Sequence, residues 1–325
     1  MEKIKKKISI SDIREGNVVE DIFVVKIKKD FKPYSKGYSF TLVLTDSSGG
    51  SLDLKFWGDS DENKVKALFD SIPSDSVLKV SGKASSYQSI MQLAINDYNS
   101  IQLLKPGEYD SSDFIPTTKK DIEQMYKNLI EIINTISDEK IKILLLEVVE
   151  KDFKEEIKIH PAAIQYHHGW VGGLLEHILE VIEICETAFK INGSLNRNLL
   201  IAGAILHDIG KIEELEVTTR IKATRKGQLI GHLTMGAFYV NKKLESSQID
   251  DLTKEKLIHL ILSHHGKFEY GSPKEPMFPE AAVLYYADEL SSKLAELHKI
   301  VEDNKDVTED DFTFVRRKGN NIFLR

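Results

Sequence analysis

An apolar run near the middle of the chain reads Leu199-Leu200-Ile201-Ala202-Gly203-Ala204-Ile205-Leu206-His207-Asp208-Ile209-Gly210-Lys211. It contains no proline and has Ala or Gly where close packing is needed, so it predicts a buried helix. At helical spacing Asp208 lies over Ile201 and Ala204, on an apolar face. A carboxylate and an imidazole on such a face are costly unless they are paired or bind a metal. The run therefore predicts either a salt-bridged core pair or part of a metal centre, with Lys211 one turn beyond His207.

Other histidines and carboxylates fall on similarly apolar helix faces. His177, for example, shares a face with Leu174 and Val181 at helical spacing. The complete inward-facing set is His177, His207, Asp208, His232, His264, His265 and Asp288. Five imidazoles and two carboxylates exceed the four ligands of a structural zinc site. They suit two divalent ions with Asp208 bridging, whereas a core in which these groups satisfy only one another is the alternative.

Nitrogen and oxygen ligands without a thiolate favour transition metals over calcium. We therefore expect two divalent metal ions, with Mn²⁺ as the first choice and Fe, Co or Zn as alternatives. Such a pair of cations polarises a phosphoryl group and lowers the pKa of a bound water, which becomes a nucleophile. The set of ligands predicts an enzyme that hydrolyses phosphate esters.

The composition is that of an ordinary globular protein, with 325 residues, 41% hydrophobic and 29% charged. No apolar run approaches the ~18 residues of a membrane span, so we expect no membrane partner. The charged N-terminus lacks a following apolar segment, so we expect no signal peptide. A single cysteine, Cys185, excludes an intramolecular disulfide and favours the cytoplasm. The net charge of −7 argues against non-specific coating of nucleic acid but permits a local basic groove.

The charge is spread unevenly along the chain. Residues 1–110 hold 16 basic and 16 acidic side chains, which leaves 28 basic and 35 acidic ones after them, so the whole excess of −7 lies in the second part. A polar stretch with a turn signal, residues 105–113, marks the change. We predict a first domain over residues 1–108, a linker over 109–120 and a second domain over 121–325.

The first domain shows the alternation of strands. Apolar and polar residues alternate over residues 22–31, 38–45, 52–57, 77–85 and 91–103, and a helical pattern over 62–72 stands between the third and fourth strands. Five strands with a helix in that place are typical of an OB-fold β-barrel.

The outward faces of this barrel are expected to collect basic and aromatic side chains, namely Lys26, Lys28, Lys55, Trp57, Lys79 and Lys83. Ammonium groups follow phosphates and rings stack on bases, which is the pattern of single-strand binding. We interpret the face as a nucleic-acid surface. The alternative is a solvated face whose aromatic residues close the ends of the barrel.

The second domain is predicted to be all-helical. Apolar spacing of three and four residues indicates helices over residues 121–136, 139–153, 171–190, 233–244, 253–263 and 279–301. A polar stretch, residues 213–228, interrupts them and resembles a hairpin, with a short strand at 217–221. The fold class is therefore multidomain, an OB-fold barrel followed by a helical bundle.

The series His177, His207-Asp208, His232, His264-His265 and Asp288 resembles the HD-domain superfamily of metal-dependent phosphohydrolases in its two-metal form. More closely, Pro161-Ala162-Ala163, His167-His168 and Gly172-Gly173-Leu174-Leu175-Glu176-His177 are similar to the YhaM family of bacterial 3′-to-5′ exoribonucleases. So are Ser263-His264-His265-Gly266, Glu269-Tyr270-Gly271-Ser272-Pro273 and Pro279-Glu280-Ala281. That family joins an N-terminal OB-fold to a C-terminal HD domain.

The resemblance implies roles for individual residues. One metal would be held by His177, His207, Asp208 and Asp288, and the other by His232, His264 and His265 with Asp208 shared. Lys211 would neutralise the scissile phosphate. His167 and His168 would line the substrate entrance, or else form a packing pair at a helix start. The resemblance also leads us to expect a second Asp three residues after Asp288, where this sequence has Ser291.

The implied function is a metal-dependent 3′-to-5′ exoribonuclease. It would hydrolyse single-stranded RNA, or alternatively single-stranded DNA, to nucleoside monophosphates by attack of hydroxide on the terminal phosphodiester. Two other functions stay open, a nucleotide phosphohydrolase with a regulatory OB domain and a non-catalytic module that binds single-stranded DNA. The sequence does not distinguish a monomer from a homo-oligomer.

Overall fold

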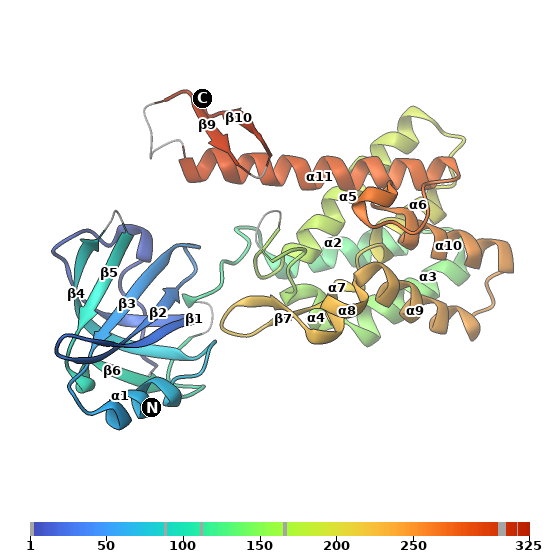
Figure 1. Ribbon diagram of the computed structural model, residues 1–325. Coiled ribbons are helices and arrows are strands. Elements are labelled where there is room, and N and C mark those ends of the chain that lie inside the picture. Colours follow the sequence, from blue (N-terminus) through green and yellow to red (C-terminus); the bar gives the residue numbers. More distant parts are fainter. Residues whose placement is uncertain (1–2, 88–89, 111–112, 165–167, 305–309, 317) are drawn as a thin grey trace. The chain divides into compact units, whose positions relative to one another are not determined.

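The computed structural model describes residues 3–87, 90–110, 113–164, 168–304, 310–316 and 318–325 (Figure 1). Contacts between residues divide the chain into two compact units. The first unit comprises Met1–Pro116 together with Thr218–Arg220, and the second comprises Thr117–Val217 and Ile221–Arg325. Within the described parts, no helix combines the length and hydropathy that crossing a bilayer requires.

The first unit is a β-barrel. Its elements are β1 (Val18–Tyr34), β2 (Gly37–Thr45), β3 (Ser51–Trp57), α1 (Glu62–Ser71), β4 (Val77–Tyr87), β5 (Ile90–Ile95) and β6 (Ile101–Leu104), with 3₁₀ turns η1 (Ile10–Asp12) and η2 (Tyr98–Ser100). The strands pair in the order β1-β2-β3-β5-β4-β6, and β1 also pairs with β4. This second pairing closes a ring of five strands, and α1 stands between the third and fourth of them, as expected for the OB-fold.

The barrel core follows from the alternation in the sequence. Leu52, Leu54 and Phe56 of β3 point inward and are fully buried, while the residues between them face outward. Phe40 of β2 stacks on Phe56, with ring centroids 5.0 Å apart. The long strand β1 carries irregularities between Val25 and Ile27 and between Lys28 and Phe31, which let one strand bend to pair on both sides.

One strand differs from the prediction. Residues 91–103 were expected to form a single strand, but β5 ends at Ile95 and β6 begins at Ile101. Asp97 causes the interruption, since its side chain accepts a hydrogen bond from the backbone N–H of Asn99 at 3.0 Å and starts the turn η2. β6 then pairs with β4 outside the ring.

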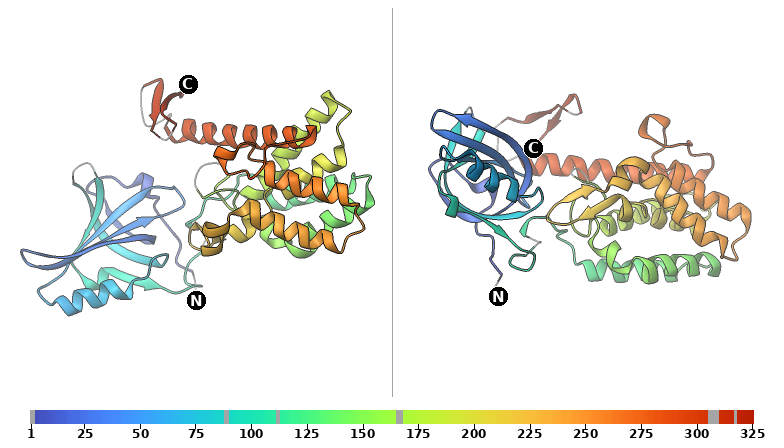
Figure 2. Two further views of the ribbon diagram at one scale, coloured as in Figure 1. Left: turned by 45° about the vertical axis from the view of Figure 1, so that its right-hand side comes forward. Right: turned by 60° about the horizontal axis from the view of Figure 1, so that its bottom comes forward.

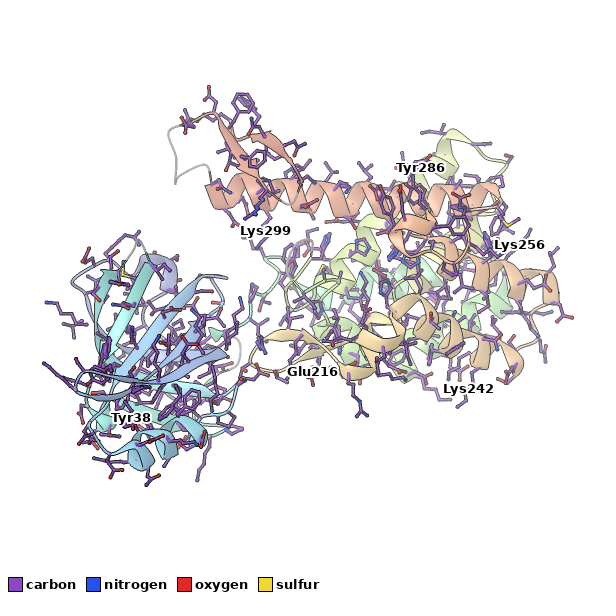
Figure 3. The ribbon with its side chains drawn as sticks, viewed as in Figure 1. Tyr38, Glu216, Lys242, Lys256, Tyr286 and Lys299 are labelled. Atoms are coloured by element: carbon purple, nitrogen blue, oxygen red, sulfur yellow. The ribbon has the colours of Figure 1, made fainter. Side chains whose placement is uncertain are left out.

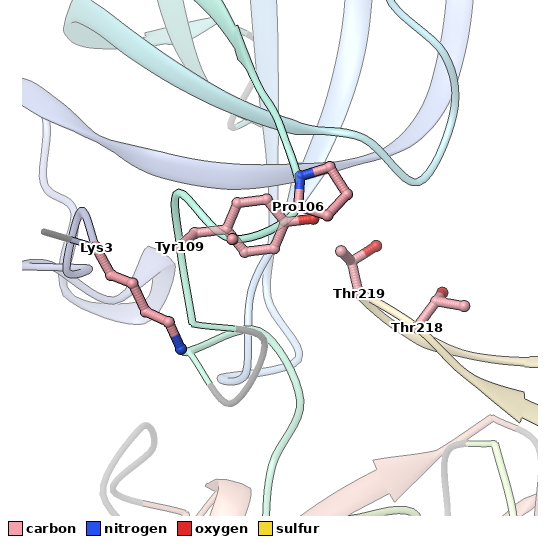
Figure 4. Close-up of a pocket in the computed structure, with 6 residues that line it drawn as sticks. Lys3, Pro106, Tyr109, Thr218 and Thr219 are labelled. Carbon is pink, nitrogen blue, oxygen red and sulfur yellow. The ribbon is translucent and has the colours of Figure 1, made fainter. Parts of the chain in front are cut away.

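A shallow pocket of about 380 Å³ lies in the first unit (Figure 4). It is lined by Lys3, Pro106, Gly107, Tyr109, Thr218 and Thr219. None of the histidines or carboxylates of the predicted metal centre lines it, so we assign it no part in the chemistry.

The second unit is a bundle of helices. Its elements are α2 (Ile122–Asn134), α3 (Glu139–Leu146), a π-helical turn η4 (Glu147–Asp152), α4 (Lys154–Ile159), α5 (Gly173–Ile191), α6 (Arg197–Leu206), α7 (Lys211–Glu214), β7 (Leu215–Val217), β8 (Ile221–Ala223), α8 (Arg225–Ile230), α9 (His232–Glu245), α10 (Asp251–Ser263), η5 (Phe268–Tyr270), α11 (Pro279–Asn304), β9 (Phe312–Val315) and β10 (Asn320–Phe323). The expected hairpin is present. Residues 218–220, which were predicted to lie within a strand, instead form the turn between β7 and β8.

Helices α5, α10 and α11 all pack against α6, and α11 runs along one edge of the bundle (Figure 2). Their facing sides bury a continuous apolar core that includes Ile178, Ile201, Leu260 and Leu284. Gly203 allows α6 to approach α10 and α11 closely, because a Cβ added there would lie 2.8 Å from a methyl group of Leu260. Cys185 belongs to this core, and burial raises the pKa of its thiol to about 12, which fits a structural residue.

Candidate metal centre

The His207-Asp208 pair lies at the C-terminal end of α6. The predicted helix over residues 199–211 is shorter than expected, because α6 ends at Leu206 and the next residues turn before α7 begins at Lys211. The backbone N–H of His207 still bonds to the Gly203 carbonyl at 2.9 Å, so its side chain keeps a helical direction. The backbone N–H of Lys211 bonds to the Asp208 carbonyl at 2.9 Å, which brings both side chains to one side of the turn.

Gly210 makes the turn compatible with its neighbour α9. A Cβ added at Gly210 would lie 2.1 Å from the carbonyl oxygen of His232 and 2.7 Å from the backbone nitrogen of Gly236. Both are backbone atoms that cannot move away cheaply. Only glycine therefore lets the start of α9, with His232, reach the turn that carries Asp208.

Four of the predicted ligands surround Asp208. Its Oδ2 lies 3.5 Å from His177 Nε2 and 3.3 Å from His207 Nε2. Its Oδ1 lies 3.5 Å from the Nε2 atoms of both His232 and His264. Each oxygen of one carboxylate thus faces a separate group of imidazoles, which is the position of a bridging ligand.

The distances between ligand atoms match those around a cation. His177 Nε2 lies 3.1 Å from Asp288 Oδ1 and 3.3 Å from His207 Nε2, and His232 Nε2 lies 3.3 Å from His265 Nε2. Two ligands at ~2.1 Å from one metal ion are about 3.0–3.4 Å apart. The residues form overlapping sets whose ligand atoms lie within 4.8 Å of one another, namely His177-His207-Asp208, His207-His264-Asp288 and His232-His264-His265.

Hydrogen bonds on the far side of each ring fix which nitrogen faces the centre. The Nδ1 atoms of His207, His264 and His265 lie 2.9, 2.7 and 3.1 Å from the carbonyl oxygens of Ala204, Ile261 and Tyr270. A carbonyl can only accept, so Nδ1 carries the proton and Nε2 presents a lone pair. His232 does the same through Glu214, at 3.0 Å.

These tautomers argue against a core in which the groups satisfy only one another. In the close pair His232–His265, both Nε2 atoms are acceptors when the rings are neutral, so these two rings cannot hydrogen-bond to each other. Asp208 Oδ1 and His264 Nε2 are among the described side-chain atoms that are buried without a hydrogen-bond partner. Unsatisfied buried acceptors are destabilising. A cation between them satisfies every one of these atoms, so the residues present fit divalent metal ions.

Three of the histidines and both carboxylates have pKa shifts in the direction that favours metal binding. Burial lowers the pKa of His177 and His264, and burial with the charges of His264 and His232 lowers that of His265 to about 3. Burial opposes ionisation of Asp208, but the charges of Lys211 and His207 hold its pKa well below the usual range. His207 differs, because the Asp208 carboxylate outweighs the effect of burial and raises its pKa. Neutral imidazoles and ionised carboxylates are the forms that bind divalent cations.

Ser291 connects His177 to a carboxylate that the sequence did not reveal. Its Oγ lies 3.0 Å from His177 Nδ1 and donates a hydrogen bond to Glu180 Oε2 at 2.9 Å. Because the hydroxyl proton goes to Glu180, the Nδ1–H of His177 donates to the hydroxyl. At the place where the resemblance led us to expect an aspartate, a serine passes the interaction on to Glu180. With Nδ1 bound to Ser291, the Nε2 atom of His177 faces Asp208 and Asp288.

Replacing Ser291 by alanine is expected to weaken metal binding by about 10- to 100-fold, because outer hydrogen bonds orient the ligand and raise its basicity. Isothermal titration of the metal-free protein with Mn²⁺ measures this change. Ser246 donates to the Lys243 carbonyl at 3.2 Å and contacts none of the proposed ligands, so Ser246→Ala provides the control variant. Unchanged affinity in Ser291→Ala would show that the tautomer of His177 does not depend on this hydroxyl.

Of the two histidines expected at the substrate entrance, the structure describes only His168. His167 lies outside the described residues. His168 is only 1% exposed, its Nε2 lies 3.0 Å from Glu180 Oε2, and its carbonyl accepts from the backbone N–H of Ala162 at 3.0 Å. This geometry favours the alternative, a packing residue at the helix start, and a substrate role for His168 stays a prediction.

The basic side chains of the barrel do not all share one face. Lys55 and Lys83 both pair with Ala94 on the outer surface, and Lys55 Nζ lies 4.4 Å from the centroid of the Trp57 ring. The expectation that Lys28 lies on an outward face is wrong. It stands opposite the inward-facing Leu42, and its ammonium donates to the Phe69 carbonyl at 2.6 Å.

An ion pair or partial burial limits two further lysines of the predicted face. Lys79 forms an ion pair with Glu20, with 2.8 Å between Nζ and Oε1, which reduces its charge for a ligand. Lys26 is half-buried and lies at the irregularity between Val25 and Ile27. The compact part of the predicted face is therefore Lys55, Trp57 and Lys83.

Sequence reasoning missed Glu180, Glu214 and the role of Ser291. Two of them had a weak signal, since Glu180 follows His177 by three residues and Glu214 follows Lys211 by three, which is one helical turn. Burial and the His232 hydrogen bond act in opposite directions on Glu214, and the net effect lowers its pKa. The carboxylate is therefore ionised beside the imidazole that it orients.

Comparison with known proteins agrees with this geometry. The HD domain family matches residues 174–293, which contain all seven proposed ligands. The chain is 34% identical over 270 residues to the 3′-5′ exoribonuclease YhaM of Geobacillus sp. (strain WCH70), which covers 82% of this chain and 80% of that protein. A solved structure of RecG bound to three-way DNA junction aligns with 58% of this chain and 26% of that one, at 13% identity and a TM-score of 0.25, which is too low to support an inference. The family resemblance expected from the His-Asp series is thus confirmed, and the chain belongs to the YhaM family of 3′-5′ exoribonucleases.

Proposed function

We propose that this protein is a divalent-metal-dependent exoribonuclease that removes nucleoside monophosphates from the 3′ end of single-stranded RNA. The relative from Geobacillus sp. (strain WCH70) is a 3′-5′ exoribonuclease, and the residues that match the HD domain family include all the proposed metal ligands. The observation that carries the proposal is the position of Asp208, whose two oxygens face separate groups of imidazole nitrogens. One bridging carboxylate between two cation sites suits cleavage of a phosphodiester.

The proposed ligands divide into two sets. His177, His207 and Asp288 would hold one cation and His232, His264 and His265 the other, with Asp208 shared. Ions bound there would neutralise the phosphate and lower the pKa of water, and we propose Mn²⁺ before Fe, Co or Zn. The chain itself orients its imidazoles through their Nδ1 partners and keeps its carboxylates ionised. Lys211 supplies a buried ammonium 2.9 Å from Asp208 Oδ2, which would stabilise the negative charge that develops on the phosphate.

The barrel would hold the strand during repeated cleavage. Lys55 and Lys83 would contact phosphates, and Trp57 would stack on a base, while Lys26 and Lys79 would add to the positive charge. Binding by stacking and charge is tolerant of sequence, which suits an enzyme that advances along a strand. The single buried cysteine fits our proposal that the enzyme acts in the cytoplasm.

Digestion of matched RNA and DNA oligomers, labelled at the 5′ end, tests this function. We expect the RNA to shorten stepwise from its 3′ end with release of nucleoside 5′-monophosphates. Treatment with EDTA should abolish the activity and added Mn²⁺ should restore it, because the buried histidines and carboxylates hold the catalytic cations.

Other results would favour the alternatives. Hydrolysis of free nucleotides without shortening of the strand would indicate a nucleotide phosphohydrolase with a regulatory barrel. Strand binding by a purified protein that contains no stoichiometric metal would indicate a non-catalytic module. Equal shortening of both oligomers would extend the substrate to single-stranded DNA.

A further inference from the structure

Exposed aromatic side chains gather in the segment that follows the His264–His265 pair and on the helix beside it. Phe268 and Tyr270 of η5 are 65% and 50% exposed, and Tyr286 is 67% exposed. Figure 3 labels Tyr286 on α11. Tyr285 is half-buried, and its ring centroid lies 4.7 Å from that of Tyr286. A group of large exposed rings on a soluble protein marks a surface that contacts another molecule.

Both sides of this aromatic group are attached to proposed metal ligands. The carbonyl of Tyr270 accepts the hydrogen bond from His265 Nδ1 at 3.1 Å. Tyr285 precedes Asp288 by three residues on α11, so the two side chains lie on the same side of the helix, one turn apart. Tyr270 and Tyr285 therefore stand next to the centre where cleavage is proposed, and the exposed Tyr286 adjoins them through its ring contact with Tyr285.

Gly266 lets the segment that follows His265 pack against helix α11. A Cβ added there would lie 2.3 Å from the ring of Tyr285, so the backbone of the segment rests directly on that ring. Its φ of +79° is in the left-handed region, which also favours glycine. The close approach sets the position of the Lys267–Tyr270 segment relative to α11.

The charges around the rings are nearly balanced. Lys267 Nζ lies 5.4 Å from the centroid of the Tyr270 ring and 3.5 Å from Glu269. Glu289 lies near Tyr285 and forms an ion pair with Lys293 at 3.6 Å. With acidic and basic groups offsetting one another, a ligand would be held chiefly by the rings.

We propose that Tyr270, Tyr285 and Tyr286 form a platform on which the 3′-terminal bases of single-stranded RNA stack, with Lys267 beside the phosphates; this inference rests on the proposed function. Every base has a π-face, so stacking accepts any sequence. It also requires bases that are free of a complementary strand, which would make the platform selective for single-stranded ends. Stacking here would hold the terminal phosphodiester at the metal centre between successive cleavages.

The test compares two ten-nucleotide RNA oligomers, one intact and one whose two 3′-terminal nucleotides are abasic. We expect Tyr286→Ala to lower kcat/KM on the intact oligomer at least about fivefold, mainly through KM, because stacking on one base is lost. On the abasic oligomer the same variant should differ little from the native protein. Tyr286→Trp should retain the preference for the intact oligomer. Phe238 of α9 is 68% exposed outside this group, so Phe238→Ala is the matched control and should behave as the native protein.

Two results would overturn the platform. One is an equal loss on both oligomers in Tyr286→Ala, and the other is no loss on the intact oligomer. If the native protein cleaves neither oligomer, the proposed function fails. Binding of the same two RNAs, measured by fluorescence anisotropy, then tests the platform. Tighter binding of the intact oligomer that disappears in Tyr286→Ala would then support it, and equal binding of both oligomers by the native protein would refute it.

Discussion

Replacing Asp208 by alanine is expected to abolish cleavage of RNA, with kcat falling at least about 10³-fold. Asp208 is the one residue of the proposed centre whose oxygens face both groups of imidazoles, at 3.3 to 3.5 Å. Its loss removes a ligand from each cation site and leaves the Lys211 ammonium buried without its carboxylate. Elemental analysis of the purified variant should show loss of bound metal together with loss of turnover.

Binding of RNA should survive this change. The proposed strand-binding residues of the barrel belong to the other unit of the chain, so fluorescence anisotropy with a labelled oligomer should show nearly native affinity. Since alanine leaves a buried cation uncompensated and can weaken the fold, Asp208→Asn serves as a second variant of the same shape. Asp152→Ala is the matched control, because Asp152 pairs with Lys243 and Tyr239 away from the centre. Turnover that persists in both Asp208 variants would contradict a mechanism based on metal ions.

Apolar periodicity was sufficient to predict the main elements of both units. The alternation of Leu52, Leu54 and Phe56 predicts an inward face, and all three are fully buried. The spacing around His177 predicts an inward histidine, and its side chain is fully buried as well. In each case the hydrophobic effect acts on residues close in sequence, so a local pattern is enough to predict which side chains are buried.

Local irregularities could not be predicted in the same way. The interruption at Asp97 depends on one side-chain hydrogen bond to the backbone, and the end of α6 at Leu206 depends on the approach of α9 to Gly210. Lys28 was placed on the wrong face because irregularities in β1 change which residues point inward. Such features change the direction of a chain without altering its average hydrophobicity.

The partners that orient the histidines were also beyond sequence reasoning. His177 and Ser291 are 114 residues apart, and the Nδ1 partners of three other rings are backbone carbonyls, which every residue has. A list of candidate ligands follows from inward-facing polar residues. The choice of tautomer follows only from the folded geometry, and it is what separates a metal centre from a buried polar cluster.

Lys211→Met is expected to lower kcat by about 10²- to 10³-fold while the protein keeps its metal. The ammonium of Lys211 lies 2.9 Å from Asp208 Oδ2 and donates to the Ala162 carbonyl at 2.6 Å, so both contacts hold it at the centre. Burial disfavours its charge, but the carboxylates of Asp208 and Asp288 raise its pKa above the usual value. The group is therefore a permanent cation at neutral pH, placed to stabilise negative charge on the phosphate.

The two variants at Lys211 and Asp208 should separate charge stabilisation from metal binding. Removing a positive charge makes the surroundings of Asp208 more favourable for divalent cations, so metal content should be unchanged or higher in Lys211→Met and lost in Asp208→Ala. Lys158 offers a matched control, since it is a buried lysine of the same unit that pairs with Glu123 at 2.9 Å. Lys158→Met should leave kcat unchanged. If Lys211→Met lost its metal, the lysine would act by maintaining the ionised state and orientation of Asp208, and its proposed contact with the phosphate would be refuted.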